Sequence, residues 1–386
     1  TDNPYFLFCS WGTKGMKTKL IMKAGRNALA ASALLAVGCG SVLAEDSTTY
    51  AFGGYVKFDA MFSDYSGDTP GSSSLCRQFY VVGCVPTSGS SRDMSTDFMA
   101  RESRINFRSD TVLDNGDKLG TYIEMDFLTT ADTSNERVSN SYPPRLRHAF
   151  LKYNGWLFGQ TWSTFMDVSV LPENLDFVGP AESTTFIRQG QVRYTTGAWE
   201  FAAENPHTDY LTNGGGAALT SDVDTIPDMV VRYTFKLDGG SYIKIAGLYR
   251  SLNVDTDAAS SSETGLGISA SAKFMIGQDD IRAMVTWGSG VGRYLALNTS
   301  RAAVLDANGS LNAIDQVAAF ISYRHLWNDK WRSNLTFGTL SIDNDTALTG
   351  TGVTETATSV HVNLLYEASP KLTIGAEYFV ANRDLE

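Results

Sequence analysis

The chain has 386 residues, of which 31 are Lys or Arg and 42 are Asp or Glu, so its formal net charge is −11. Such an acidic surface repels a polyanion and excludes nucleic-acid binding as the main function. After the first 44 residues no apolar run approaches the roughly 20 residues that a membrane-spanning helix needs, which excludes a helical membrane protein.

The first 44 residues have the composition of a targeting segment. A start at Met16 is followed by basic residues, an apolar run over residues 28–37 and small residues up to Ala44. This order is typical of a secretory signal peptide, so we expect residues 16–44 to be cleaved off and residues 1–15 to be in-frame upstream sequence without a structural role. Lipidation at Cys39 is the alternative. Five basic residues and one acidic residue lie in this segment, which leaves the mature chain at −15.

Two cysteines remain after the leader, Cys76 and Cys84, in a Ser- and Gly-rich stretch. In an oxidising compartment a pair eight positions apart forms a small disulfide clip on a loop. A zinc site would need further ligands nearby, and the surrounding sequence offers none. We therefore predict a disulfide, no metal site and no cofactor.

Residues 45–386 are predicted to be all-β. Apolar and polar residues alternate with a period of two in many segments, clearly so in 104–108, 229–236 and 359–366. Each such segment is a strand with one apolar and one polar face. Strands of a soluble β-sandwich alternate as well, so the connections between strands must distinguish the two architectures.

Tight turns and long polar segments alternate along the chain, seven of each. The tight turns have hairpin chemistry and lie at 114–117, 154–155, 196–197, 238–240, 277–279, 328–329 and 369–370. The long segments cover roughly 65–99, 129–144, 164–184, 205–225, 252–262, 289–311 and 342–356. Because tight turns and long loops alternate strictly, every long loop lies at one end of the sheet. This arrangement is typical of outer-membrane barrels, whereas nothing in a β-sandwich requires it.

Fourteen connections join fifteen strands, whereas single-chain bacterial barrels have an even number. We therefore expect a transmembrane antiparallel β-barrel of 16 strands, whose last strand is missing from this chain. Sixteen strands enclose an aqueous channel. Aromatic residues next to the tight turns fit an interfacial girdle; they are Trp156, Tyr194, Trp199, Trp327 and Trp331.

The polar strand faces would line such a channel, and basic residues gather there in the first half of the chain. They are Arg104, Arg108, Arg145, Arg147, Arg193 and Arg232. Arginine offers a permanently charged, planar fork of donors, so a ladder of arginines can pass an anion between several weak sites. The alternative is that these arginines pair with carboxylates on the same faces and only stiffen the wall.

The third long segment interrupts the strand pattern with acid and no base. Between residues 160 and 187 it contains four carboxylates and no Lys or Arg; the carboxylates are Asp167, Glu173, Asp176 and Glu182. Two prolines stiffen the segment, and several hydrophobic residues could anchor it. We predict that about 164–184 folds into the pore with its acidic side facing the arginines. An ordinary external loop would explain the length but not the hydrophobic content.

Around this segment the sequence resembles the DcaP-like family of Gram-negative outer-membrane trimeric porins. The resemblance rests on residues 145–150, 159–163, 172–173 and 176–180. It implies a 16-stranded homotrimer in outer-membrane lipid and lipopolysaccharide, with loop three constricting each pore and small anions such as dicarboxylates passing through. It also implies that the constriction contains Arg145, Arg147, Pro172, Glu173 and Asp176. No heptads precede Tyr50, so barrel walls and loops alone would hold a trimer.

The leading hypothesis is a porin for passive diffusion of small hydrophilic solutes, with a preference for small organic anions. A non-specific general porin and a structural or adhesive barrel are the alternatives. A barrel enzyme would need a nucleophile, a base and an orienting group at one rim, and none of the four histidines lies in such a motif. A plugged receptor would need a separate domain before the first strand.

Overall fold

The computed structural model describes residues 47–72, 74–89, 94–129, 139–257 and 259–386. The predicted signal peptide, the upstream residues 1–15 and Cys39 lie outside these residues. Within the described ranges, no helix is long and apolar enough to cross a membrane.

Fifteen strands form one antiparallel sheet, in which neighbours are paired in the order β1-β4-β5-β6-β7-β8-β9-β12-β13-β14-β15-β18-β19-β20-β21. Within the described residues, β1 and β21 are the edge strands of this sheet. The strands are β1 (Ser47–Tyr55), β4 (Arg104–Val112), β5 (Lys118–Asp126), β6 (Arg145–Tyr153), β7 (Trp156–Trp162), β8 (Arg188–Thr196), β9 (Trp199–Glu204), β12 (Asp228–Lys236), β13 (Tyr242–Asp255), β14 (Ser260–Ile276), β15 (Asp279–Ser289), β18 (Asp315–Leu326), β19 (Trp331–Asp343), β20 (Thr354–Ser369) and β21 (Leu372–Leu385). The predicted all-β fold is confirmed. The sixteenth strand stays a prediction.

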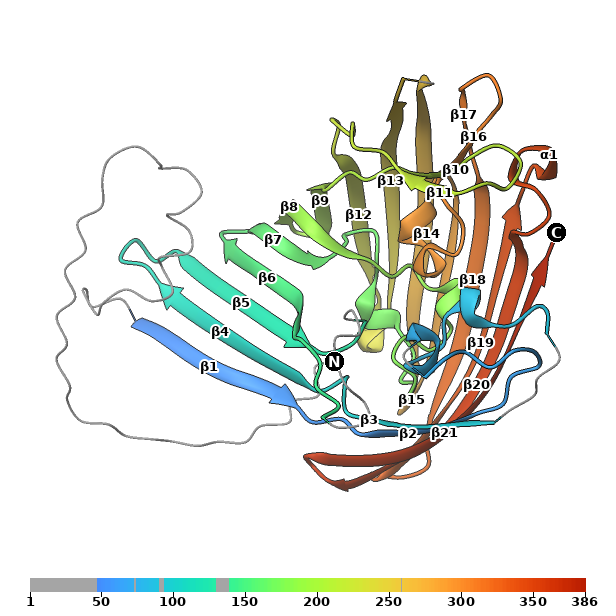
Figure 1. The fold of residues 1–386 in the computed structure, drawn as a ribbon. Coiled ribbons are helices and arrows are strands. Elements are labelled where there is room, and N and C mark those ends of the chain that lie inside the picture. Colours follow the sequence, from blue (N-terminus) through green and yellow to red (C-terminus); the bar gives the residue numbers. More distant parts are fainter. Residues whose placement is uncertain (1–46, 73, 90–93, 130–138, 258) are drawn as a thin grey trace.

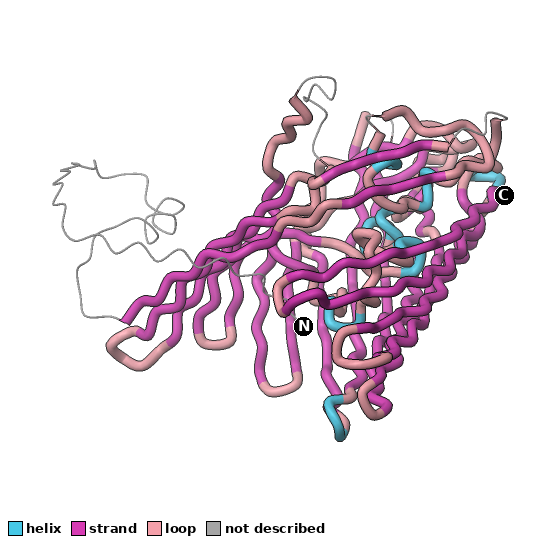
Figure 2. The backbone as a smooth tube through the Cα atoms, turned by 90° about the horizontal axis from the view of Figure 1, so that it is seen from below, coloured by secondary structure: helices cyan, strands magenta, loops and turns pink. Residues whose placement is uncertain are grey.

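The sheet is strongly curved, and short turns and long loops lie at opposite ends of it (Figures 1 and 2). One predicted long segment, 252–262, is wrong, because β13 runs to Asp255 and β14 starts at Ser260. The reason is burial: Leu252 and Val254 are fully covered, so their alternation with polar residues continues the strand beyond the expected boundary.

Two small sheets belong to the long loops, and short helices lie in the long loops and, in the case of η6, in the tight turn between β12 and β13. β2 (Asp59–Ser63) pairs with β3 (Ser95–Met99), and a four-stranded sheet contains β10 (Asp209–Leu211), β11 (Ala218–Thr220), β16 (Ala303–Leu305) and β17 (Leu311–Ala313). The helices are η2 (Leu75–Arg77), η3 (Val82–Cys84), η4 (Val168–Val170), η5 (Ala181–Ser183), η6 (Asp238–Gly240), η7 (Gly292–Tyr294), η8 (Ala296–Asn298) and α1 (Thr346–Thr349). The four-stranded sheet buries Tyr210 and Ala303 in one cluster with Leu252 and Val254.

In the large sheet, apolar side chains are exposed on one face and polar side chains are buried on the other. This distribution is the reverse of that in a soluble protein. On β14 the side chains of Leu266 and Ile268 are exposed, whereas those of Ser269 and Ser271 are buried. On β20, Val360, Val362 and Leu364 are likewise exposed, whereas Ser359, His361 and Asn363 are buried. Four tryptophans of the expected girdle, next to the short turns, are exposed as well; they are Trp156, Trp199, Trp327 and Trp331. A continuous apolar outer face with aromatic residues at its edge is suited to lipid.

A charge placed on the outer face tests this assignment. Ile268 is 51% exposed near the middle of β14, and Ile268→Arg should destabilise the membrane-inserted protein by about 2–4 kcal/mol, because the charge would lie in hydrocarbon. The measurement is reversible unfolding from lipid vesicles. Ser262→Arg, at the long-loop end of the same strand, should cost at most about 1 kcal/mol. Equal effects of the two substitutions would contradict a lipid-facing Ile268.

Candidate functional site

The long loop between β7 and β8, here called loop 3 (residues 163–187), lies on the concave side of the sheet (Figure 1). It contains η4 and η5, and these helices contact strands of the second half of the chain from β14 to β20. Its apolar side chains Phe165, Met166, Val170 and Val178 are at most 5% exposed. These four side chains pack loop 3 against the inner face of the sheet, whereas Leu171, Leu175 and Phe177, the anchors expected from the sequence, are only partly buried.

Two loop 3 carboxylates pair with cations of late strands. Asp167 accepts hydrogen bonds from Lys244 Nζ on β13 at 2.6 Å and from Ser271 Oγ on β14 at 2.8 Å. Glu173 is held by Arg332 on β19, whose Nη2 lies 2.5 Å from Oε1 and whose Nε lies 2.9 Å from Oε2. A two-pronged pair of this kind fixes orientation as well as distance. The pair between Glu173 and Arg332 therefore holds the middle of loop 3 against β19.

The other two loop 3 carboxylates are buried among uncharged donors. Asp176 accepts hydrogen bonds from the backbone N–H groups of Tyr80 at 2.8 Å and Gly179 at 3.1 Å. Glu182 Oε1 accepts one from Ser359 Oγ on β20 at 2.7 Å. Burial raises the pKa of both carboxyls, because it disfavours the charged form more than these donors favour it.

Residues of β19, β20 and β21 make close contacts with loop 3. At Gly338 on β19 an added Cβ would lie 2.0 Å from Glu182 Oε1, so glycine is required for this close approach. On β21, Glu377 Oε2 accepts the backbone N–H of Leu175 at 2.6 Å. On β20, Asn363 Nδ2 donates to the backbone oxygen of Glu173 at 2.8 Å. Backbone and side chains of loop 3 are thus both bonded to the wall.

The predicted arginines pair mainly with carboxylates of neighbouring strands. Arg147, 1% exposed, donates to Glu124 at 2.7 Å and to Asp126 at 2.8 Å. Arg145 reaches Asp126 at 2.7 Å, and Arg104 lies 3.8 Å from Glu124. These three arginines and two carboxylates form one cluster on β4, β5 and β6.

The remaining predicted arginines lie apart from that cluster. Arg193 and Arg232 share Glu200, at 3.6 Å and 2.5 Å. Arg108 pairs with Asp110 at 2.9 Å with 61% of its side chain exposed, toward the turn between β4 and β5. The six arginines therefore occupy three separate places.

Loop 3 meets the arginines through groups other than its carboxylates. Among the described residues, no ion pair joins one of the six predicted arginines to a loop 3 carboxylate. Instead, the guanidinium groups of Arg145 and Arg147 lie 5.9 Å and 5.7 Å from the ring centre of Phe177, and Arg232 donates to the backbone oxygen of Met166 at 2.7 Å. The acidic side of loop 3 is bound to late strands, and its aromatic side faces the cluster of β4, β5 and β6.

Sequence reasoning missed three basic residues. Lys244 and Arg332 occupy polar positions of β13 and β19, so the same alternation, followed into the second half of the chain, would have found them. Arg188 begins β8 opposite Trp162. Its guanidinium lies 4.5 Å from the Trp162 ring centre, and its Nη1 is buried and has no hydrogen-bond partner in the part of the chain that the structure describes. No motif marked this residue.

Arg188 adds a positive charge to the existing cluster. Its charge interacts with those of Arg104, Arg145 and Arg147, and Arg147 also lies over the Trp162 ring, at 5.7 Å. Glu124 and Asp126 compensate two of the four arginines, so the cluster keeps an excess of two positive charges. In the described part of the chain, no group of three His, Cys, Asp or Glu side chains could hold a metal ion.

A curved antiparallel sheet with an apolar outer face and an inward-folded loop is the fold of an outer-membrane channel. The solved structure of the outer membrane channel DcaP of Acinetobacter baumannii has a TM-score of 0.71 at 22% identity, over 88% of this chain and 92% of that one. An anion-selective porin from Comamonas acidovorans scores 0.54 at 11% identity, over 88% and 90%. The trimer form of OmpT, an outer membrane protein of Vibrio cholerae, scores 0.51 at 13%, over 88% and 90%.

The family profile described as DcaP outer membrane protein matches residues 24–385. The chain belongs to this family of outer-membrane proteins, and the predicted family and location are confirmed. No curated protein matches the sequence.

The pair between Glu173 and Arg332 should contribute measurably to the docking of loop 3. A double-mutant cycle with Glu173→Gln and Arg332→Gln should give a coupling energy of about 1–2 kcal/mol, less than for a fully buried pair because Glu173 is partly solvated. The measurement is the opening free energy of the loop 3 amides from hydrogen exchange. Additive effects of the two substitutions would show that the pair contributes nothing.

The buried carboxyls should make docking of loop 3 depend on pH. Because the pKa of Glu182 is raised in the folded protein, the docked state binds the proton more tightly. Docking should therefore be strongest at low pH and weaken as the pH rises through the folded pKa. Hydrogen exchange of the loop 3 amides, corrected for intrinsic rates, measures this. Glu182→Gln should reduce the pH dependence to what Asp176 contributes; an unchanged pH profile would refute the role of Glu182.

Proposed function

We propose that this protein is a porin for passive diffusion of small hydrophilic solutes, with a preference for small organic anions such as dicarboxylates. The channel fold and the family membership support the first part. The position of loop 3 supports a constriction, because a packed segment on the concave side of the sheet narrows the path along it. The charge of the cluster next to loop 3 supports the preference for anions.

The main support for an anion preference is that Nη1 of Arg188 has no partner among the described residues. The described residues contain no ion-pair partner for Arg188, whereas Arg147 is 1% exposed and is held by two carboxylates. A buried cationic donor without a partner is costly, and a carboxylate solute would satisfy it. Trp162 below the guanidinium restricts its orientation, and the side chain as a whole is half-buried. An incoming anion would have to displace the atoms that cover Nη1 in order to bind it.

The surrounding arginines suit passage rather than tight binding. Conduction requires sites that attract a solute but release it again. Arg104 and Arg145 are already shared with Glu124 and Asp126, so each offers only a weak further attraction to a carboxylate. A second carboxylate on the same solute would be attracted to one of these while the first meets Arg188, which explains a preference for dicarboxylates.

One group of side chains resembles the serine, histidine and carboxylate arrangement of a hydrolase, but its buried position disfavours a hydrolytic activity. Ser359 Oγ lies 3.1 Å from His361 Nε2, and His361 Nδ1 lies 3.1 Å from Glu377 Oε1. Yet Ser359 and His361 are at most 1% exposed, and the serine hydroxyl is bonded to Glu182. Loop 3 covers the hydroxyl that would have to attack a substrate. The group is better explained as part of the docking of loop 3.

We also propose that residues 16–44 direct export and are removed, that residues 45–386 form the barrel, and that three copies assemble. The support for assembly is the likeness to the trimer form of the Vibrio cholerae protein and the resemblance to trimeric porins. The apolar outer face would contact lipid, lipopolysaccharide and neighbouring copies.

Removal of the Arg188 charge tests the anion preference. Arg188→Gln should raise the dicarboxylate concentration that half-blocks the channel by about tenfold, equivalent to about 1.5 kcal/mol for a charge-assisted hydrogen bond. It should also move the reversal potential in a salt gradient toward cations. Currents of purified protein in planar bilayers measure both quantities.

Lys330→Gln is the matched control, since it removes the same charge at the exposed turn between β18 and β19. It should leave block and reversal potential unchanged. Equal block of wild type and Arg188→Gln would contradict the role of Arg188, and block by sugars as strong as by dicarboxylates would favour a non-specific porin.

A further inference from the structure

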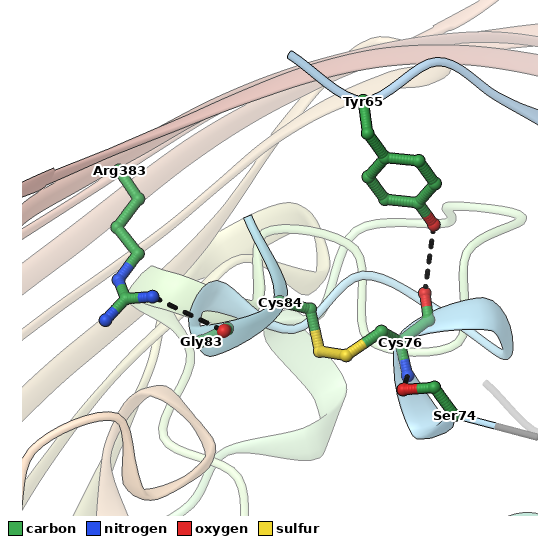
Figure 3. Close-up of a disulfide and its surroundings, with 6 residues drawn as sticks. All are labelled: Tyr65, Ser74, Cys76, Gly83, Cys84 and Arg383. Atoms are coloured by element: carbon green, nitrogen blue, oxygen red, sulfur yellow. Dashed lines mark hydrogen bonds between the residues drawn. A yellow bond between two sulfur atoms is a disulfide. The ribbon is translucent and has the colours of Figure 1, made fainter. Parts of the chain in front are cut away.

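A second loop segment besides loop 3 lies on the concave side of the sheet. Residues 75–84 belong to the long connection between β1 and β4, contain η2 and η3, and are closed by a disulfide between Cys76 and Cys84 (Figures 1 and 3). We call these residues the clip. The sequence predicted a disulfide on a loop, but nothing in it indicated that the loop turns inward.

The middle of the clip is buried. Phe79 and Tyr80 are 6% exposed and Val82 is fully buried. The ring of Phe79 contacts that of Phe177 edge-on, with ring centres 5.1 Å apart. The backbone N–H of Tyr80 donates to Asp176. The inner end of the clip therefore rests directly on loop 3.

The two ends of the clip are held by different parts of the wall. Arg77 donates to both carboxylate oxygens of Asp97 on β3, at 2.7 Å and 2.9 Å. Arg383 on β21 donates to the backbone oxygen of Gly83 at 3.3 Å (Figure 3). The ring of Tyr80 lies 5.8 Å from that of Phe379, also on β21. The clip thus spans from the β2–β3 hairpin to the last strand of the sheet.

A cavity of about 300 Å³ lies where the clip meets loop 3. Leu75, Phe79 and Val81 of the clip form one side of it, and Phe177 and Phe186 of loop 3 form another. Arg145, a member of the arginine cluster, also lines this cavity. The clip therefore borders the same space as the proposed anion path.

We propose that the clip is a second constriction element, which together with loop 3 sets the narrowest cross-section of the channel and depends on the disulfide to stay in place. This inference rests on the proposed function, because a cross-section has a consequence only if solutes pass. The disulfide closes a short loop and restricts the open conformations that the clip can adopt. Without it, the hydrogen bond from Tyr80 to Asp176, the ring contact with Phe177, the Arg77–Asp97 pair and the contacts with β21 would have to hold the clip by themselves.

Reduction of the disulfide should widen the channel and leave the barrel intact. Dithiothreitol breaks the S–S bond, supplies two electrons and two protons to give two cysteine thiols, and is itself oxidised to a cyclic disulfide. Loop 3 keeps its bonds to Lys244, Arg332 and Ser359, none of which involves the clip. The change should therefore be confined to the space that the clip occupies.

The test is single-channel conductance of the full-length purified protein in planar bilayers before and after dithiothreitol, with thiol labelling to confirm reduction. We expect conductance and the size limit for polyethylene glycols to rise on reduction and to return on reoxidation. C76S/C84S should show the higher conductance from the start and no response to the reagent. Phe79→Ala, which keeps the disulfide but removes the ring against Phe177, should raise conductance under oxidising conditions.

Three results would overturn the inference: reduced wild type with unchanged conductance and size limit, C76S/C84S identical to oxidised wild type, or Phe79→Ala without effect. Each would appear in channels that still conduct, so the porin function itself would stand. Protein that forms no channels in any state would instead contradict the proposed function. Comparable yields of folded protein from all variants exclude misfolding as the cause.

Discussion

The structure depends on the need to pair every backbone polar group of a sheet that faces hydrocarbon. Water is absent on that side, so N–H and C=O groups must bond to adjacent strands, and apolar side chains must point outward. Strict alternation then sends every second, polar side chain to the concave side. The reversed polarity of β14 and β20, with exposed Ile268 and buried His361, is the direct result.

Charged side chains on the concave side of the sheet need partners of opposite charge. This requirement explains how loop 3 is held. Strands of the first half carry both signs, so Arg147 finds Glu124 and Asp126 on the neighbouring strand. In the second half, Lys244 and Arg332 receive their carboxylates from loop 3. Both pairs are shielded from water only in part, and together with the hydrogen bonds to β14, β20 and β21 they fix the loop in one place. The clip in turn packs on loop 3, which makes both inward segments one unit.

The strand assignments could be predicted because a strand pattern is local. A period of two, interrupted by turn residues such as those at 154–155 or 277–279, is readable without knowing what the strand pairs with, and all seven tight turns separate paired strands. The prediction for 252–262 was wrong because Leu252 and Val254 are covered by β10 and β16, segments far away in the sequence. Strand ends that depend on such remote packing leave little local signal.

The sequence by itself determined the all-β class, the alternation of short turns and long loops, and the unusual composition of loop 3, because each of these is a property of neighbouring residues. Only the tertiary structure decided which charges meet. It bound the carboxylates of loop 3 to β13, β19 and β20, left Arg188 without an ion-pair partner among the described residues, and turned the clip inward. Side chains more than a hundred residues apart become partners through sheet curvature and loop path, and neither is encoded by a pattern within a single segment.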